Sequence, residues 1–169
     1  MLPLGHLQGT IILLEDDDQS AALICELLTA SGFKVIWLVE SSTALERILE
    51  LEPLVAIIDL DIQGSSSEEI IAHIHRANLK RRPRIMALTA HTAEADGLGN
   101  SPGNSPGNSL ENSLGGGMPR SDQPEYRADT YVQRPLNPER FVAQLHNLLV
   151  QVQAAMPSLE RSAQSFQSS

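Results

Sequence analysis

The sequence predicts an α/β fold with a doubly wound sheet of five parallel strands and helices on both faces. Short apolar runs alternate with helical patterns five times along the chain. Two of these runs, 11–14 and 56–58, show no polar alternation, which is typical of strands buried on both faces. Acidic residues follow both runs, at the strand ends where open α/β sheets place their chemistry.

Length and composition restrict the possible functions. The 169 residues suit one domain with some unstructured extra chain, and 41% hydrophobic residues suffice for a core. The net charge of −9 disfavours nonspecific binding to nucleic acids, and the basic run 80–82 with Arg84 indicates a solvated loop. A single cysteine, Cys25, favours a reducing, cytoplasmic location. No segment approaches 18 apolar residues, so we expect a soluble protein without membrane insertion.

The first strand is predicted at 10–14, after a leader at 1–8, and it ends in four acids, 15–18. Asp17 or Asp18 suits the N-cap of a helix that runs to about residue 31, whereas Glu15 and Asp16 lie closest to the strand end. A second strand is expected at 33–38. The spacing of Thr43 and Glu46 predicts a capping box for the next helix, which ends before residue 53.

The third strand, 56–61, carries Asp59 at its end, where an aspartate can serve chemistry or simply begin a turn. Serines at 65 and 66 with glutamates at 68 and 69 predict the start of a helix that runs to about 77. His73 and His75 lie two apart on this helix and point in different directions, which disfavours a shared metal site.

The fourth strand, 84–88, ends at Thr89, and a degenerate Gly-Asn-Ser-Pro repeat follows at 99–114. This repeat cannot build a core, so a flexible insertion is predicted at about 93–127. A last strand at 131–133 leads to Arg134, and Asn137 is expected to cap the final helix. Residues 153–169 are predicted to form a disordered tail, and 9–152 the folded domain.

In this fold the ends of four strands bring together five polar side chains: Glu15, Asp16, Asp59, Thr89 and Arg134. Two carboxylates about 4 Å apart repel by about 4 kcal/mol at an effective dielectric of 20, so a cluster of three either protonates or holds a divalent cation. An all-oxygen site suits Mg²⁺. A cation, a hydroxyl and a guanidinium around Asp59 fit a carboxylate nucleophile that accepts phosphate.

Four segments together resemble the receiver domain of two-component response regulators, a CheY-like, flavodoxin-like fold. They are Ile12-Leu13-Leu14-Glu15-Asp16-Asp17, Ile57-Ile58-Asp59, Leu88-Thr89-Ala90 and Tyr131-Val132-Gln133-Arg134-Pro135. The resemblance covers residues 9–152 apart from the insertion. It implies that Asp59 is the phosphoacceptor and that Glu15, Asp16, Asp59 and the main-chain carbonyl of Asp61 hold Mg²⁺. It also implies that Thr89 contacts the phosphoryl group and that Tyr131 changes position on activation.

The implied function is that of a single-domain response regulator in a two-component phosphorelay. A histidine kinase or phosphotransfer protein would phosphorylate Asp59, and output would pass to a downstream protein; the domain itself catalyses only its own phosphorylation and dephosphorylation. Three residues depart from the family pattern: Arg134 replaces the usual lysine before a cis proline, Gln63 a proline and Ser67 a glycine. The insertion falls where the family has its fourth helix.

Asp61 and His91 lie two residues beyond Asp59 and Thr89, and we expect them to flank the mouth of the site. We hypothesise that they set the lifetime of the phosphoryl group by controlling the approach of water.

Two other functions compete with this interpretation. A pseudo-receiver would use the same fold for binding without phosphorylation. The sequence Asp59-Leu60-Asp61 also resembles the nucleophile motif of haloacid-dehalogenase-type phosphatases. That family needs the motif on its first strand and a later lysine, whereas the only lysines here are Lys34 and Lys80.

Overall fold

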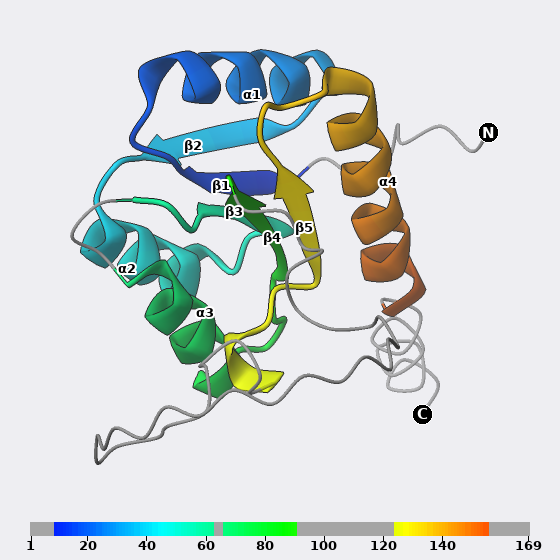
Figure 1. The fold of residues 1–169 in the computed structure, drawn as a ribbon. Coiled ribbons are helices and arrows are strands. Elements are labelled where there is room, and N and C mark those ends of the chain that lie inside the picture. Colours follow the sequence, from blue (N-terminus) through cyan, green and yellow to red (C-terminus); the bar gives the residue numbers. More distant parts are fainter. Residues whose placement is uncertain (1–8, 63–65, 91–123, 156–169) are drawn as a thin grey trace, which may run out of the picture.

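The computed structural model describes residues 9–62, 66–90 and 124–155. Five parallel strands form one sheet in the order β2-β1-β3-β4-β5, with helices on both sides (Figure 1), which confirms the predicted fold class. The strands are β1 (Thr10–Leu14), β2 (Lys34–Leu38), β3 (Val55–Asp59), β4 (Arg84–Thr89) and β5 (Thr130–Gln133). The helices are α1 (Asp18–Ala30), α2 (Ser41–Leu51), α3 (Ser67–Arg76), the 3₁₀ turn η3 (Pro124–Tyr126) and α4 (Pro138–Ala155).

The helices form two layers, with α1 and α4 on one face of the sheet and α2 and α3 on the other (Figure 1). Successive residues of a strand point to opposite faces, so β1 contributes Ile11 and Leu13 to the core under α1 and α4. Its Ile12 and Leu14 enter the second core, under α2 and α3. The strands β1 and β3 are therefore apolar without interruption, because alternate side chains enter the core on each face of the sheet.

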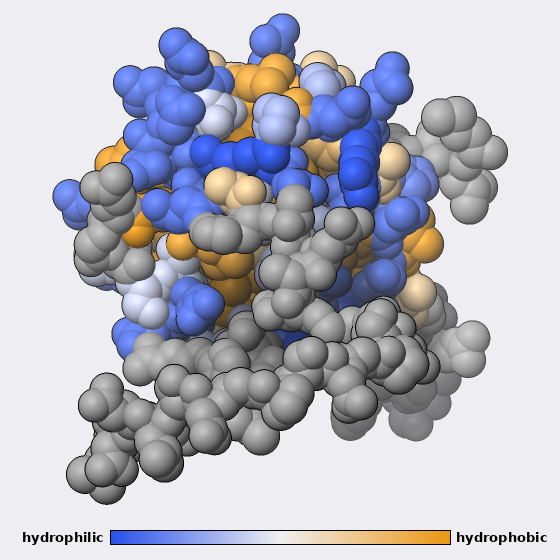
Figure 2. Space-filling model, viewed as in Figure 1, coloured by the Kyte–Doolittle hydropathy of each residue, from blue (hydrophilic) through white to orange (hydrophobic). Residues whose placement is uncertain are grey.

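The described surface is largely polar on the face that Figure 2 draws, with smaller hydrophobic areas between the polar side chains. Among the described helices, none is both long and apolar enough to cross a membrane.

The helix ends confirm some capping predictions and correct another. Asp17 is the N-cap of α1 and accepts a hydrogen bond from the backbone N–H of Gln19 at 3.2 Å. The predicted capping box of Thr43 and Glu46 is wrong, because α2 already begins at Ser41 with Glu40 in the N-cap position. The Thr43 hydroxyl instead donates to the Glu40 carboxylate at 3.3 Å. Gly32 follows α1 with a φ of 88°, which favours glycine at this helix stop.

The C-terminal part of the domain differs from the sequence prediction in two places. The last helix continues to Ala155, so residues 153–155 are helical rather than part of a tail, and the buried Val152 extends its apolar stripe. Between β4 and β5 the described residues contain η3 and no longer helix, and the repeat at 99–114 lies outside them. The 3₁₀ turn packs against α3, where the guanidinium of Arg76 lies 5.8 Å from the ring centre of Tyr126.

Candidate functional site

Three carboxylates converge at the C-terminal edge of the sheet, as the sequence predicts. Glu15 and Asp16 follow β1, and Asp59 is the last residue of β3, the neighbouring strand. One oxygen from each side chain lies within 4.8 Å of the others. Glu15 and Asp59 are buried, with exposed fractions of 0% and 1%, whereas Asp16 is exposed at the rim. The site therefore combines two buried carboxylates with one that is open to solvent.

Arg134 holds the two buried carboxylates together. Its position is set by β5, because the Arg134 backbone N–H donates to the carbonyl of Thr89 at the end of β4, at 2.9 Å. One guanidinium nitrogen, Nη2, contacts Oε2 of Glu15 and lies 3.0 Å from Oδ2 of Asp59. The peptide bond between Arg134 and Pro135 is cis. The sequence predicted a guanidinium near phosphate; here it is the internal counter-ion of the acids.

The backbone around the acids supplies further donors. The N–H of Asp17 donates to Oε1 of Glu15 at 3.1 Å, and the N–H of Asp61 donates to Oδ1 of Asp59 at 3.0 Å. Asp59 thus ends β3, and its side chain also begins a turn, as one of the two sequence interpretations has it. Each buried carboxylate has one oxygen on a backbone donor and the other on Arg134, which fixes both rotamers.

Burial changes the protonation of this cluster. The pKa of Glu15 is raised from 4.5 to about 7, chiefly because burial removes the carboxyl from water and in smaller part because of the charge of Asp59, while the Asp17 N–H and Arg134 oppose the shift. Burial also raises the pKa of Asp59, against the effect of the Asp61 N–H and Arg134. These groups gain from any added cation, because a positive charge between them offsets both burial and repulsion.

The carboxylates present have the chemistry of a divalent-cation site. Hard oxygen ligands from separate strands, one of them solvent-facing, suit an ion that keeps several of its waters, as Mg²⁺ does. Arg134 pairs with both buried acids, so a bound ion would have to share them with the guanidinium.

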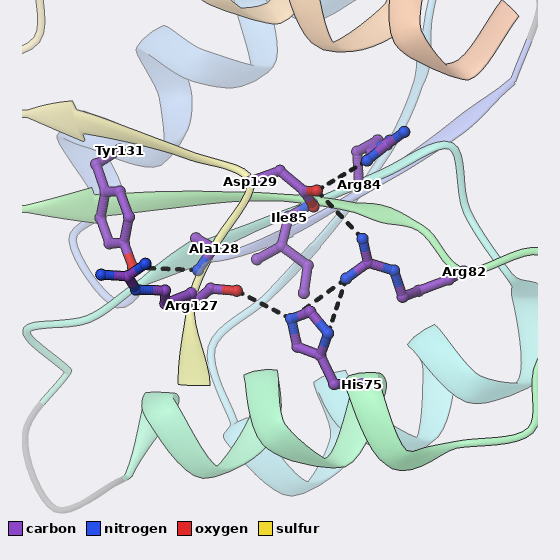
Figure 3. Close-up of polar contacts among 8 residues, drawn as sticks. All are labelled: His75, Arg82, Arg84, Ile85, Arg127, Ala128, Asp129 and Tyr131. Carbon is purple, nitrogen blue, oxygen red and sulfur yellow. Dashed lines mark hydrogen bonds and ion pairs between the residues drawn. The ribbon is translucent and has the colours of Figure 1, made fainter. Parts of the chain in front are cut away.

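The other predicted site residues fall at different distances from this cluster. Thr89 ends β4, the strand beside β3, and is half-buried. The Asp61 side chain accepts the Ala90 N–H at 2.6 Å, which ties the turn after β3 to the end of β4. Tyr131 is 41% exposed, and its hydroxyl accepts the Ala128 N–H at 3.1 Å, close to the start of β5 (Figure 3). His91 lies outside the described residues.

The sequence analysis missed Trp37 as a neighbour of the site. Its indole N–H donates to the main-chain oxygen of Glu15 at 2.8 Å, although the ring is 41% exposed. The signal was available, because Trp37 and Leu38 pair with Leu13 and Leu14 at the end of β1. A pocket of about 310 Å³ adjoins the site on its other side, between α1 and residues 134–136, and its lining includes Glu15, Arg134 and several leucines.

Comparisons of the sequence with known proteins give partial matches. No family model matches the sequence. The chain is 39% identical over 85 residues to the circadian input-output histidine kinase CikA of Synechococcus elongatus, a match to 50% of this chain and 11% of that protein. It is 23% identical over 135 residues to the phosphate regulon transcriptional regulatory protein PhoB of Escherichia coli, covering 80% of this chain and 49% of PhoB. The chain thus spans half or less of these relatives.

Solved structures extend the likeness to the whole fold. The NMR structure of the CikA pseudo-receiver domain matches with a TM-score of 0.53 and 28% identity, over 83% of this chain and 97% of that one. The receiver domain of the sensor histidine kinase PA1611 from Pseudomonas aeruginosa, with a magnesium ion in its active-site cleft, matches with a TM-score of 0.62 and 16% identity, over 83% and 97%. The chain has the receiver-domain fold.

Proposed function

We propose that this chain is a receiver domain that accepts a phosphoryl group on Asp59 from a histidine kinase or phosphotransfer protein and passes the signal to another protein. One observation carries the proposal: Glu15, Asp16 and Asp59 bring carboxylate oxygens within 4.8 Å at the ends of two adjacent parallel strands. In this proposal residues 9–152 form the receiver domain. Mg²⁺ held by these three side chains, with the main-chain carbonyl of Asp61, would offset the charge of an incoming phosphoryl group.

In the proposed reaction Asp59 is the nucleophile. Its carboxylate oxygen attacks the phosphorus of the donor, a P–O bond to Asp59 forms, and the P–N bond of a phosphohistidine breaks with its electron pair on the imidazole nitrogen. Arg134 and Thr89 lie at the neighbouring strand ends, so their donors can turn toward phosphoryl oxygens. Water later cleaves the acyl phosphate and regenerates the carboxylate.

Labelling by a small phosphodonor tests this proposal. The full chain is incubated with acetyl phosphate and Mg²⁺, and intact-mass spectrometry measures the added phosphoryl group. We expect one label on the wild type, none on Asp59→Asn, and normal labelling of Asp18→Asn, an exposed acid of the first turn of α1. Absence of label on the wild type, with the same preparation folded, would contradict the proposal.

A second function, that of a pseudo-receiver, is favoured by the similarity to the CikA pseudo-receiver domain. The ion pairs of Arg134 with Glu15 and Asp59 give this alternative a physical basis, because they already satisfy the acids without metal or phosphate. A folded wild type that takes no label from acetyl phosphate would support it. The phosphatase alternative is not favoured, since Asp59 ends the third strand and that family carries its motif on the first.

A further inference from the structure

A group of basic side chains lies together at the end of the sheet opposite to Asp59. Five of the twelve lysines and arginines of the chain belong to it. Four come from the loop after α3 and the start of β4, and the fifth directly follows η3. We call this group the basic surface; its members are Lys80, Arg81, Arg82, Arg84 and Arg127.

Hydrogen bonds hold the parts of the basic surface together (Figure 3). Oδ1 of Asp129 accepts from Arg82 at 3.2 Å and from Arg84 at 2.9 Å, while Oδ2 accepts the Ile85 N–H at 2.7 Å. The His75 ring contacts the guanidinium of Arg82 at 2.8 Å and the main-chain oxygen of Arg127 at 2.9 Å. This network joins α3, the start of β4 and the start of β5, so the basic side chains project from a fixed frame.

The basic surface keeps a net positive charge. Asp129 faces it on one side, and the Glu52 carboxylate accepts the backbone N–H groups of Lys80 and Arg81 on the other. Five cations against these two carboxylates leave a surplus of three positive charges, and since the whole chain carries −9, the rest carries −12. Lys80, Arg82 and Arg127 are exposed.

The surface is separate from the candidate phosphorylation site. Arg84 pairs with Val55 and Leu88 with Asp59, so four residues of strand, about 13 Å, separate the two levels. Acids gather at the C-terminal edge of the sheet and bases at the N-terminal edge. A Debye length of about 10 Å at 0.1 M salt lets the two edges act as independent electrostatic surfaces.

We propose that the basic surface binds an Asp- and Glu-rich polypeptide segment of a partner protein. The exposed cations Lys80 and Arg127 attract carboxylates, and the fixed frame lowers the entropic cost of presenting them. A long polyanion such as duplex DNA would extend past this small surface onto a remainder that carries −12 and would be repelled there. A short acidic segment fits within the surface and avoids that repulsion.

Fluorescence anisotropy with the full chain tests the proposal. The probe is a labelled peptide of about twelve residues with alternating Glu and Gly, compared with a Gln-Gly peptide of equal length, and binding should weaken steeply between about 50 and 200 mM salt. Lys80→Glu combined with Arg127→Glu should weaken binding at least about tenfold. The matched control, Lys34→Glu with Arg140→Glu, changes the same charges at exposed positions on β2 and α4 and should weaken it less than about threefold.

The outcomes separate this proposal from the one about Asp59. Equal binding of the two peptides, or equal losses in the two double variants, would overturn a specific basic surface. Tighter binding of a short DNA duplex than of the Glu-Gly peptide would overturn the choice of partner. Circular dichroism confirms that each variant is folded. Both double variants should still take the acetyl phosphate label at the wild-type rate, because neither pair of residues touches the acidic cluster.

Discussion

Replacing Arg134 by methionine removes the internal counter-ion of the candidate site and keeps most of the aliphatic stem. In the wild type the guanidinium contacts Glu15 and Asp59, whose side chains are 0% and 2% exposed. Without it, two buried carboxylates face each other, and each keeps a hydrogen bond from a backbone N–H group. We expect the free energy of unfolding to fall at pH 8 in the presence of a chelator.

The magnitude follows from the burial of the ion pairs. Breaking a fully buried ion pair by removing one partner costs about 3–5 kcal/mol. Arg134 is 24% exposed and Asp16 is open to solvent, so water screens part of this interaction. We therefore expect a loss of about 2–3 kcal/mol at pH 8. The loss should shrink toward pH 5.5, because a proton on Glu15 can then replace the missing guanidinium.

Mg²⁺ should act in the opposite direction on the same variant. With the guanidinium gone, a divalent ion no longer competes for Glu15 and Asp59, so its affinity should rise above that of the wild type. Binding to the folded state at a hundred times the dissociation constant stabilises by about 2.7 kcal/mol, which would restore most of the loss. Urea unfolding with and without Mg²⁺ measures both effects. The fluorescence of Trp37, the single tryptophan, follows unfolding close to the site, because its indole N–H donates to the main-chain oxygen of Glu15.

The matched control is Arg140→Met, which removes an exposed arginine from the first turn of α4. It should change stability by less than about 0.5 kcal/mol and leave the response to Mg²⁺ unaltered. The reasoning would be refuted if Arg134→Met were as stable as this control at pH 8 with chelator, or if Mg²⁺ stabilised the wild type as much as the variant.

Three further predictions concern single acids. The pKa of Glu15 is about 7 in the folded protein and 4.5 in the unfolded chain. The folded state therefore binds this proton more tightly, and the resulting stabilisation is present below pH 4.5 and lost as pH rises through 7. Glu15→Gln should remove about 3 kcal/mol of this pH dependence from the free energy of urea unfolding. Asp61→Ala should change the autodephosphorylation half-life of labelled protein, and an unchanged half-life would dismiss a role in water access. Asp129→Ala should lower the free energy of unfolding by about 2 kcal/mol, against a negligible change for the exposed Glu50→Gln.

The sheet could be predicted from the sequence because apolar runs of β1 and β3 admit no alternative to two-sided burial. All five strands were placed within two residues of their observed bounds. The start of α2 could not be predicted from the sequence. Thr43 and Glu46 have the spacing of a capping box whether they lie at the end of the helix or inside its first turn. Local spacing fixes a pattern, whereas packing of Ala44 and Ile48 fixes where the helix begins.

The candidate site was predictable to the level of which strand ends meet, and Glu15, Asp16 and Asp59 do converge. The pairing of Arg134 with both buried acids could not be predicted, because it depends on the order of the strands in the sheet. The hydrogen bond from Trp37 to Glu15 depends in the same way on register between β1 and β2. Contacts of this kind join residues far apart in the chain, and sequence periodicity carries no information about them.

A crystal structure with Mg²⁺ and beryllofluoride, a mimic of the phosphoryl group, tests the central claim most directly. We expect the metal between Glu15, Asp16 and Asp59, the beryllofluoride on a carboxylate oxygen of Asp59, and Arg134 withdrawn from at least one of its two acids. An empty cluster under these conditions, with Arg134 still bridging Glu15 and Asp59, would contradict the proposal that this domain carries a phosphoryl signal.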